Sequence, residues 1–299
     1  MKLFAICFVL SFNNVMRCFL KRNGYEAQID TFGAELVSLK RDNQEIIWCA
    51  DPQYWGNASL VLFPFIGRNY DDTYTIQGKR YQMGIHGFAS ASEFMILEQK
   101  TDSLFLSLKE NEETLKNYPF RFELRIRYVL TDHGLSVSFE VINDCDEPLP
   151  FNLGFHPGFR LEKSLEQYRV FFPEMNDPSE IGIVSRCMLN GENRKCVFPD
   201  RCIPLNKDLF TESARIYSGM GSIAILQKQE KDQFAVVYEG FENIVLWQTL
   251  NSDADFICIE GWNGLPGRFE CIEDIYDAPG RKILEPKQRK QYWVQIRFS

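Results

Sequence analysis

Hydrophobic and polar residues alternate along much of this chain. In residues 121–130 every second side chain is apolar, and most of the side chains between them are charged. Residues 135–141 repeat the alternation, and the Thr-Asp-His-Gly segment that separates the two runs is typical of a turn. Because successive side chains of a strand point to opposite faces of its sheet, the pattern predicts an antiparallel hairpin over residues 121–142.

The same period recurs near both ends of the chain. Apolar residues alternate again through 292–298, and residues 19–40 form short alternating runs broken at Asn23-Gly24 and at Gly33. Helical periodicity is scarce, and only residues 109–119, which end at Pro119, favour a short helix. Many short strands joined by polar turns predict an all-β fold, a large antiparallel β-sandwich or a barrel-like relative of one.

The N-terminal residues do not share this pattern. An apolar run from Leu3 to Phe12 has about the length of a signal-peptide core and is too short to span a membrane as a helix. Three interpretations stay open: a signal-like segment, which would make the protein secreted; a start called too early, with Met16 first; or a short packed extension. We therefore treat residues 1–16 separately. The rest shows no repeat or linker, so a single domain is expected over 17–299.

Charge and cysteine content narrow the classes of protein. A formal net charge of −8 argues against nucleic-acid binding, which needs a basic surface. The nine cysteines show no CxxC pair and no ligand-like histidine spacing, so neither zinc nor another metal is expected. Their odd number and irregular spacing favour free thiols and a cytoplasmic location. A single bridge among Cys187, Cys196 and Cys202 is the alternative.

The three histidines differ in their surroundings. His86 and His156 are flanked by glycines, and a proline follows His156, so both lie in irregular backbone of the kind that carries binding residues. A core histidine bonded to a backbone carbonyl would account for either one equally well. His133 lies in the predicted turn at 131–134 and is expected to be solvated.

Two charged residues follow apolar runs. Residues 256–259 lead directly into Glu260, and an ionised carboxylate is costly to bury unless it is paired. Glu260 is therefore either a satisfied structural charge or a base held ready for a substrate proton. Arg68 ends the run at 61–68 and is either a surface charge or a ligand clamp that uses its fork of donors.

Four motifs occur in a defined order: "FPFIGR", "IHGFA", "NLGFHPGF" and "CIEGWNGLPG". Together with "TFGAELVSLK" and "WCADPQYWG", they make this chain resemble the aldose 1-epimerase (galactose mutarotase-like) family, specifically its lactose-operon X-type branch. The resemblance runs from about Cys18 to the C-terminus. It implies a large β-sandwich of the galactose mutarotase type (a supersandwich) with a sugar site on one concave face.

The resemblance also implies roles for particular residues. Glu260 would be the general base and His156 the general acid, while Arg68 and His86 would bind the sugar hydroxyls or the ring oxygen. Trp262 could form a stacking wall for the sugar. Opening a cyclic hemiacetal requires removal of the C1 hydroxyl proton and protonation of the ring oxygen, for which a carboxylate and an imidazole suffice. The implied enzyme is an isomerase that needs no metal, nucleotide, flavin or other cofactor.

The chain departs from the family pattern near the glutamate. The family motif commonly has a proline after the glutamate and an acidic residue a few positions later, whereas Gly261 and Gly267 stand here. An aspartate that binds sugar hydroxyls in many mutarotases also has no motif-level match. By location, the candidates for it are Asp232, Glu239 and Asp255. Trp247 could join the stacking wall, although core packing is its expected role; Phe155 and Phe159 are expected in the core.

The leading hypothesis is an aldose 1-epimerase that interconverts the α and β anomers of a hexose, a small-molecule partner, as a monomer or homodimer. One alternative is a hexose-6-phosphate mutarotase, which would need basic residues at the mouth of the site; Lys79, Arg80 and Arg160 lie near the motifs in sequence. Another is a non-catalytic carbohydrate-binding or sensing protein on the same fold. A glycoside hydrolase is disfavoured because only one convincing carboxylate is present.

Overall fold

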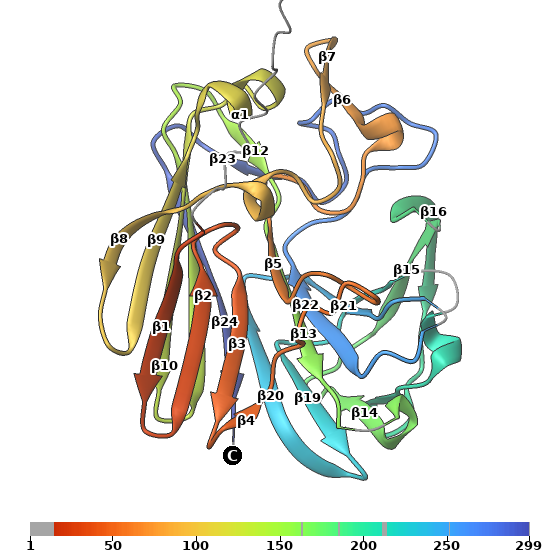
Figure 1. The fold of residues 1–299 in the computed structure, drawn as a ribbon. Coiled ribbons are helices and arrows are strands. Elements are labelled where there is room, and N and C mark those ends of the chain that lie inside the picture. Colours follow the sequence, from red (N-terminus) through yellow and green to blue (C-terminus); the bar gives the residue numbers. More distant parts are fainter. Residues whose placement is uncertain (1–14, 163, 185, 211–213, 251, 299) are drawn as a thin grey trace, which may run out of the picture.

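The computed structural model describes residues 15–162, 164–184, 186–210, 214–250 and 252–298. Two large antiparallel sheets dominate it (Figure 1). In spatial order the first consists of β17 (Cys202–Pro204), β14 (Tyr168–Phe171), β19 (Ile223–Lys228), β20 (Lys231–Glu239), β24 (Arg289–Arg297), β11 (Gly134–Asn143), β10 (Phe122–Thr131), β9 (Ser103–Lys109) and β8 (Met95–Gln99). The second consists of β16 (Met188–Lys195), β15 (Ser179–Val184), β18 (Arg215–Ser218), β21 (Asn243–Trp247), β22 (Phe256–Trp262), β13 (Gly154–Arg160) and β5 (Ser59–Leu62).

Smaller elements flank these sheets. A four-stranded sheet contains β1 (Arg17–Arg22), β2 (Tyr25–Asp30), β3 (Leu36–Arg41) and β4 (Gln44–Glu45), and two pairs are formed by β6 (Thr73–Ile76) with β7 (Lys79–Gln82) and β12 (Leu149–Phe151) with β23 (Lys282–Leu284). The one α-helix in the described residues is α1 (Glu112–Asn117). Short 3₁₀ turns cover Tyr70–Asp72, Ala89–Ala91, Leu165–Gln167, Pro199–Arg201 and Lys207–Phe210. None of the helices in the described part of the chain has the length and apolar character that a membrane crossing needs.

The pattern-based predictions are confirmed. Strands β10 and β11 form the expected hairpin, with Phe122 opposite Asn143 and Thr131 opposite Gly134 at its turn. The alternating C-terminal run is β24, and the breaks near residues 23 and 33 separate β1, β2 and β3. Helix α1 begins at a capping box, in which the Asn111 side chain accepts from the Glu113 and Thr114 backbone amides. The fold is the predicted large antiparallel β-sandwich.

The core lies between the two large sheets. From the nine-stranded sheet it takes residues such as Leu124 and Ile126, and from the seven-stranded sheet residues such as Phe155, Phe159 and Ile259, all fully buried in one cluster. Burial of each such side chain contributes about 1.5–3 kcal/mol to the free energy of unfolding. The prediction that Phe155 and Phe159 are core residues is confirmed.

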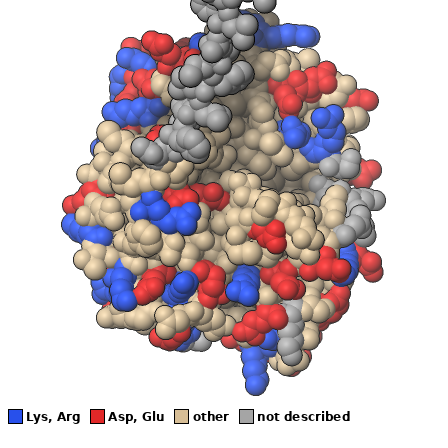
Figure 2. Space-filling model, viewed as in Figure 1, with Lys and Arg blue, Asp and Glu red and all other residues tan. Residues whose placement is uncertain are grey.

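Strand β22 has two different faces. Ile257 and Ile259 point into the core between the sheets, whereas Cys258, Glu260 and Trp262 point the other way and belong to separate apolar surroundings. On that side the loops around the β6–β7 hairpin stand above the sheet in Figure 1. Figure 2 shows the surface hollowed in the upper half of the same view, below that hairpin. The outer face of the seven-stranded sheet therefore carries Cys258, Glu260 and Trp262 away from the main core.

The cysteines among the described residues are all free. The alternative of a bridge among Cys187, Cys196 and Cys202 is therefore wrong. Cys202 lies on β17 of the nine-stranded sheet and Cys187 in the turn between β15 and β16 of the other sheet, so they belong to different layers. Cys7 lies outside the described residues.

Candidate active site

Two neighbouring strands bring His156 and Glu260 together. Strands β13 and β22 pair antiparallel, with Gly154 opposite Trp262 and Gly158 opposite Cys258. That register places His156 opposite Glu260, although the two residues are more than 100 positions apart in sequence. Opposite residues of an antiparallel pair carry their side chains on the same face, so both side chains leave the sheet on its outer side.

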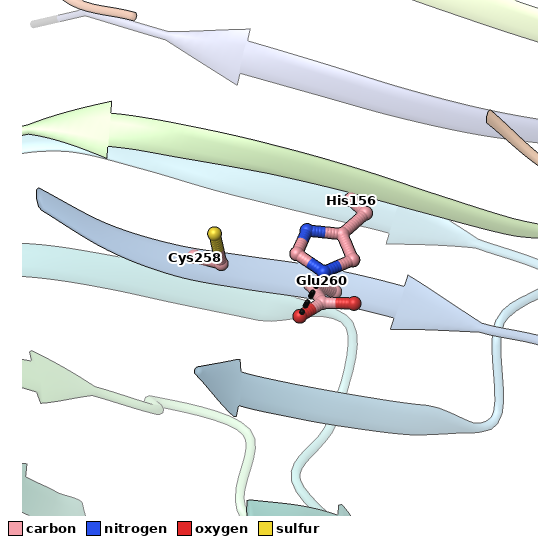
Figure 3. A group of neighbouring side chains, drawn as sticks. All are labelled: His156, Cys258 and Glu260. Carbon is pink, nitrogen blue, oxygen red and sulfur yellow. Dashed lines mark ion pairs between the residues drawn. The ribbon is translucent and has the colours of Figure 1, made fainter. Parts of the chain in front are cut away.

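The two side chains are in contact. His156 Nε2 lies 3.3 Å from Glu260 Oε1 (Figure 3), and the two residues are only 6% and 1% exposed. Trp262 Nε1 donates a hydrogen bond of 2.8 Å to the other carboxylate oxygen, Oε2. His156 Nδ1 and Glu260 Oε1 are buried without a partner of hydrogen-bond geometry among the described residues, so the His–Glu contact is a close approach rather than a hydrogen bond. Two polar atoms are thus left for a ligand.

Burial determines the proton affinity of this pair. It raises the pKa of Glu260 well above its ordinary value of 4.5, and the hydrogen bond from Trp262 only partly opposes this. It also lowers the pKa of His156 well below 6.5, with the neighbouring His86 acting in the same direction. Both effects penalise a net charge on the pair. When the pair holds one proton, burial favours the form with that proton on Glu260 and a neutral His156 over the form with a carboxylate and an imidazolium.

Aromatic rings hold the His156 imidazole in place. Trp55 stacks on it with ring centroids 4.9 Å apart, and Trp247 approaches it edge-on at 5.5 Å. Trp247 is half-buried in a small cluster with Phe256, so its expected core packing is only part of its role. The sequence analysis did not single out Trp55, and its only signal there was the motif at residues 48–56.

The structure changes the expected role of Trp262. Its ring is 1% exposed, and its one polar group is bound to Glu260. A ring so enclosed offers little surface to a sugar. Trp262 therefore positions Glu260, and a stacking wall formed by this ring is not supported; the half-buried Trp247 is the better candidate for one.

His86 lies beside the pair in a strained backbone conformation. Its φ of 64° is unusual for a residue with a side chain, and the next residue, Gly87, also has a positive φ. Its ring centroid is 5.9 Å from that of His156. Nδ1 of His86 accepts a hydrogen bond of 3.0 Å from the Gly67 amide. Burial, followed by the charge of Arg68, lowers the pKa of His86 to about 4, so the ring is neutral near pH 7. Its proton then sits on Nε2, which can donate to a ligand.

Arg68 lies at the edge of the site. Its positive charge helps to lower the pKa of His86, and its guanidinium forms an ion pair of 3.0 Å with Asp72. The backbone of Arg68 is bonded to Cys187 and Gly267, so two other loops fix its position. The sequence analysis overlooked Asp72, which is the acidic residue that the structure places next to a predicted sugar-binding residue. Its spacing of four from Arg68 was the only available signal.

The acidic candidates chosen by location are not supported. Asp232 lies on β20 of the nine-stranded sheet, where it accepts a hydrogen bond from Gln227. Glu239 is exposed at the end of the same strand. Asp255 is exposed and precedes Glu260 by five residues, roughly 17 Å along an extended chain. None of the three joins the His156–Glu260 pair.

The basic residues considered for a phosphate are also spread out. Lys79 packs on the Tyr81 ring at 4.8 Å, and Arg80 is exposed on β7. Arg160 lies on β13 four residues beyond His156, roughly 13 Å away along the strand. His133 is exposed in the turn between β10 and β11, as predicted.

The glycine that replaces the family's proline has a packing reason. Gly261 lies on the core side of β22, where a Cβ atom would come within 2.6 Å of the Tyr238 ring. Tyr238 donates a hydrogen bond of 2.8 Å to the carbonyl of Ile259. This close approach of Tyr238 accounts for Gly261 and leaves the orientation of Glu260 unaffected.

One group of side chains at the site could hold a metal ion. Cys258 lies two residues before Glu260 on the same face of β22, and the potential ligand atoms of His156, Cys258 and Glu260 lie within 4.8 Å of one another. Sequence spacing gave no indication of this group because its members come from two strands.

Known proteins match this chain over most of its length. A family model described as aldose 1-epimerase matches residues 17–181. The plasmid-borne protein LacX of Lactococcus lactis subsp. lactis is 30% identical over 294 residues, which cover 93% of this chain and 98% of that protein.

Two solved structures agree with this match. A galactose mutarotase-like protein from Lactobacillus casei superposes with a TM-score of 0.89 at 29% identity, covering 94% of this chain and 99% of its own. A galactose mutarotase related enzyme from Lactobacillus acidophilus superposes with a TM-score of 0.87 at 31% identity, covering 95% and 98%. With these relatives and the family model in agreement, this chain belongs to the aldose 1-epimerase family.

Proposed function

We propose that this protein is an aldose 1-epimerase that interconverts the α and β anomers of a free hexose, with Glu260 as base and His156 as acid. One observation carries the proposal: a histidine and a glutamate are in contact at 3.3 Å, and each retains one buried polar atom without a hydrogen-bond partner among the described residues. Such atoms are costly to leave unsatisfied. A ligand hydroxyl at Glu260 Oε1 would satisfy the carboxylate, next to the Nε2 atom of His156.

The reaction begins from the carboxylate and imidazolium form of the pair, which burial disfavours and which hydrogen bonds from the bound sugar would have to stabilise. Glu260 removes the proton of the C1 hydroxyl while His156 donates a proton to the ring oxygen. The bond between C1 and the ring oxygen breaks, and C1 becomes an aldehyde carbon. The two oxygens share C1, so an acid and a base in contact can reach both of them.

The open-chain sugar then rotates about its C1–C2 bond. The pair now holds its proton on Glu260, and the roles reverse: His156 removes the proton from the ring hydroxyl as it attacks C1, and Glu260 protonates the new C1 hydroxyl. No proton is gained or lost overall. The pair has zero net charge before and after each step. Burial favours the first transfer, which leaves both groups neutral, and opposes the second, which restores the ion pair.

Neighbouring residues support this exchange. Trp262 fixes the carboxylate through Oε2 and leaves Oε1 for the sugar. We assign to His86, through its Nε2 proton, and to Arg68 the binding of sugar oxygens. Trp55 and Trp247 hold the His156 ring on two sides.

Charge pairing near the site favours an unphosphorylated sugar. Arg68 pairs with Asp72, and Arg268, which follows the Gly267 that is bonded to Arg68, pairs with Glu273. A phosphate would have to compete with both carboxylates. Glucose and galactose are therefore better candidates than a hexose 6-phosphate.

The proposal is tested by anomer exchange followed by NMR. Fresh α-D-glucose, α-D-galactose and glucose 6-phosphate are each mixed with the wild-type protein or with Glu260→Gln. Faster equilibration with the wild type only, on one of the free hexoses, supports the proposal. Acceleration confined to the phosphate ester would reassign the substrate. Line broadening of a sugar without any acceleration would establish the binding or sensing alternative.

A further inference from the structure

We propose that His156, Cys258 and Glu260 form a three-ligand site for a thiophilic divalent cation such as Zn²⁺, and that the bound cation shuts off access of sugar to the pair. The metal site stands on geometry alone, and only the inhibition rests on the proposed function. Within the described residues it is the single cluster of at least three histidine, cysteine or acidic side chains with that geometry.

The strand geometry brings the three ligands to one face. Cys258 and Glu260 are two residues apart on β22, so both side chains leave the same side of the strand. His156 projects toward them from β13 (Figure 3). Their potential ligand atoms lie within 4.8 Å of one another. Bonds of about 2.0–2.3 Å to tetrahedral zinc place ligand atoms about 3.5 Å apart, so rotation of the cysteine side chain and a shift of about 1 Å complete the site.

The chemistry of the three donors also points to zinc. One imidazole nitrogen, one thiolate and one carboxylate oxygen are all accepted zinc ligands, and three protein ligands leave a fourth position open. His156 and Glu260 each keep a buried atom without a hydrogen-bond partner in the described residues, and both are more than nine-tenths buried. A cation bound through Glu260 Oε1 would give that oxygen a partner. Without sugar or metal, that oxygen remains a source of instability.

The surroundings orient two of these donors and enclose the third. Trp262 anchors Glu260 through Oε2, and Trp55 stacks on the His156 ring. Cys258 is fully buried among Trp48 and Phe256. Such outer partners orient metal ligands and exclude water.

Binding of the cation must release protons. The Cys258 thiol loses its proton to become a thiolate, and the proton shared by His156 and Glu260 also leaves. The product is a zinc ion held by neutral imidazole, thiolate and carboxylate, with two protons transferred to the buffer. The same imidazole and carboxylate are then unable to exchange protons with a sugar.

Co²⁺ is the probe of choice because a cobalt–thiolate bond absorbs in the near ultraviolet. The full chain is titrated with Co²⁺ under anaerobic conditions with no sugar present. We expect one equivalent to bind with a thiolate band that Zn²⁺ then removes. Cys258→Ser should lose the band and bind Co²⁺ about tenfold or more weakly, whereas Cys202→Ser, a buried thiol on β17, should behave as wild type.

A second measurement uses the wild type alone, so it does not depend on whether Cys258→Ser folds. Zn²⁺ titrated calorimetrically into the wild type in buffers of different ionisation enthalpy should release about two protons per ion. Absence of a Cys258-dependent band, or release of fewer than one proton, overturns the metal site.

If Co²⁺ binds through Cys258 but the wild type does not accelerate anomer exchange, the metal site stands and the proposed function fails. In an active protein, Zn²⁺ should raise the apparent KM for the sugar, and unchanged kinetics at saturating Zn²⁺ would refute the inhibition.

Discussion

Two buried glutamates, one in each large sheet, behave in opposite ways. Glu123 on β10 is 4% exposed and Glu260 on β22 is 1% exposed. Glu260 is enclosed more deeply, and the two carboxylates also differ in their partners. Glu123 accepts hydrogen bonds from Ser107 at 2.7 Å and from Arg125 at 2.8 Å, and Lys109 lies 3.7 Å away. Glu260 has one neutral donor and a histidine that burial keeps from charging easily.

The pKa values follow from these partners. For Glu123, burial raises the pKa, but the hydrogen bonds and charges of Arg125, Ser107 and Lys109 outweigh it, and the pKa falls below 4.5. For Glu260, burial dominates and the pKa rises. Glu123 is an ionised carboxylate whose partners stabilise its sheet. Glu260, with its raised pKa, is suited to take up and release a proton. A buried acid thus indicates function only when its partners leave it unsatisfied.

The largest expected effect is that of Glu260→Gln on turnover. Loss of the base should lower kcat for anomer exchange by about 10⁴, the upper end for a general base. Stability should not fall. A carboxyl whose pKa is raised on folding makes the fold less stable as pH rises above its unfolded pKa, and glutamine removes that cost. Thermal unfolding at pH 7 should therefore give an equal or higher Tm than wild type. If Glu260→Gln stays active, Glu260 is a structural charge, as Glu123 is, and not the base.

The next effect in size concerns the partner of the base. His156→Asn should lower kcat by about 10²–10⁴, because asparagine retains a donor but cannot transfer a proton. His86→Asn serves as the matched control in a neighbouring histidine. It should raise KM more than it lowers kcat, since His86 is assigned to binding. If both variants show the same kcat and KM, the division of roles between the two histidines is wrong.

The sequence predicted the strands and the two catalytic candidates, but not the relation between them. Alternation marks neither β13 nor β22. Residues 256–259 are a continuous apolar run, and His156, which was expected in irregular backbone, lies in strand β13. The register of the two strands depends on pairing between segments about 100 residues apart. That register places His156 opposite Glu260 and brings in Cys258. The partners of Glu123 were also hidden, because Ser107 and Lys109 come from β9, the strand that pairs with β10. Trp55 and Asp72 were missed because each acquires its role only from a neighbour supplied by folding.

A smaller effect is expected at the other glutamate, on stability alone. Glu123→Gln should lower the free energy of unfolding at pH 7 by about 1–3 kcal/mol, since Arg125 loses the closer of its two carboxylate partners and keeps only Glu140 at 3.5 Å. The pKa of Glu123 is lowered on folding, so this stabilisation is present above about pH 4.5 and is lost as pH falls through the folded-state value. Chemical denaturation of the wild type and of Glu123→Gln should give a smaller difference in the free energy of unfolding at about pH 3 than at pH 7. The anomer-exchange rate of Glu123→Gln should stay within about twofold of wild type. A large loss of activity would show that Glu123 is not a purely structural charge.

The pH dependence of activity should be weaker than that of an isolated histidine. The pair works only in its singly protonated state, and burial disfavours both the doubly protonated and the fully deprotonated pair. The lowered pKa of His156 moves the acid limb below about pH 6.5, and the raised pKa of Glu260 moves the basic limb upward. We expect kcat/KM to change little around pH 6.5, the ordinary pKa of histidine, because both limbs are displaced away from it. A midpoint near pH 6.5 would mean that His156 titrates as a solvated histidine.

The smallest expected effect is that of removing residues 1–14. We propose that the chain from about residue 17 folds as one domain, because β1 begins at Arg17 and core residues follow from Cys18 onward. The cut should precede Met16, whose amide donates to the Thr31 hydroxyl and whose carbonyl accepts from the Thr31 amide. The contacts that set Glu123 and Glu260 apart all come from residues 107–262. The truncated protein should therefore retain the wild-type Tm, the anomer-exchange rate and the opposite responses to the two glutamine substitutions. A truncated protein that is folded but inactive would show that the N-terminal residues complete the site around Glu260 and leave Glu123 untouched.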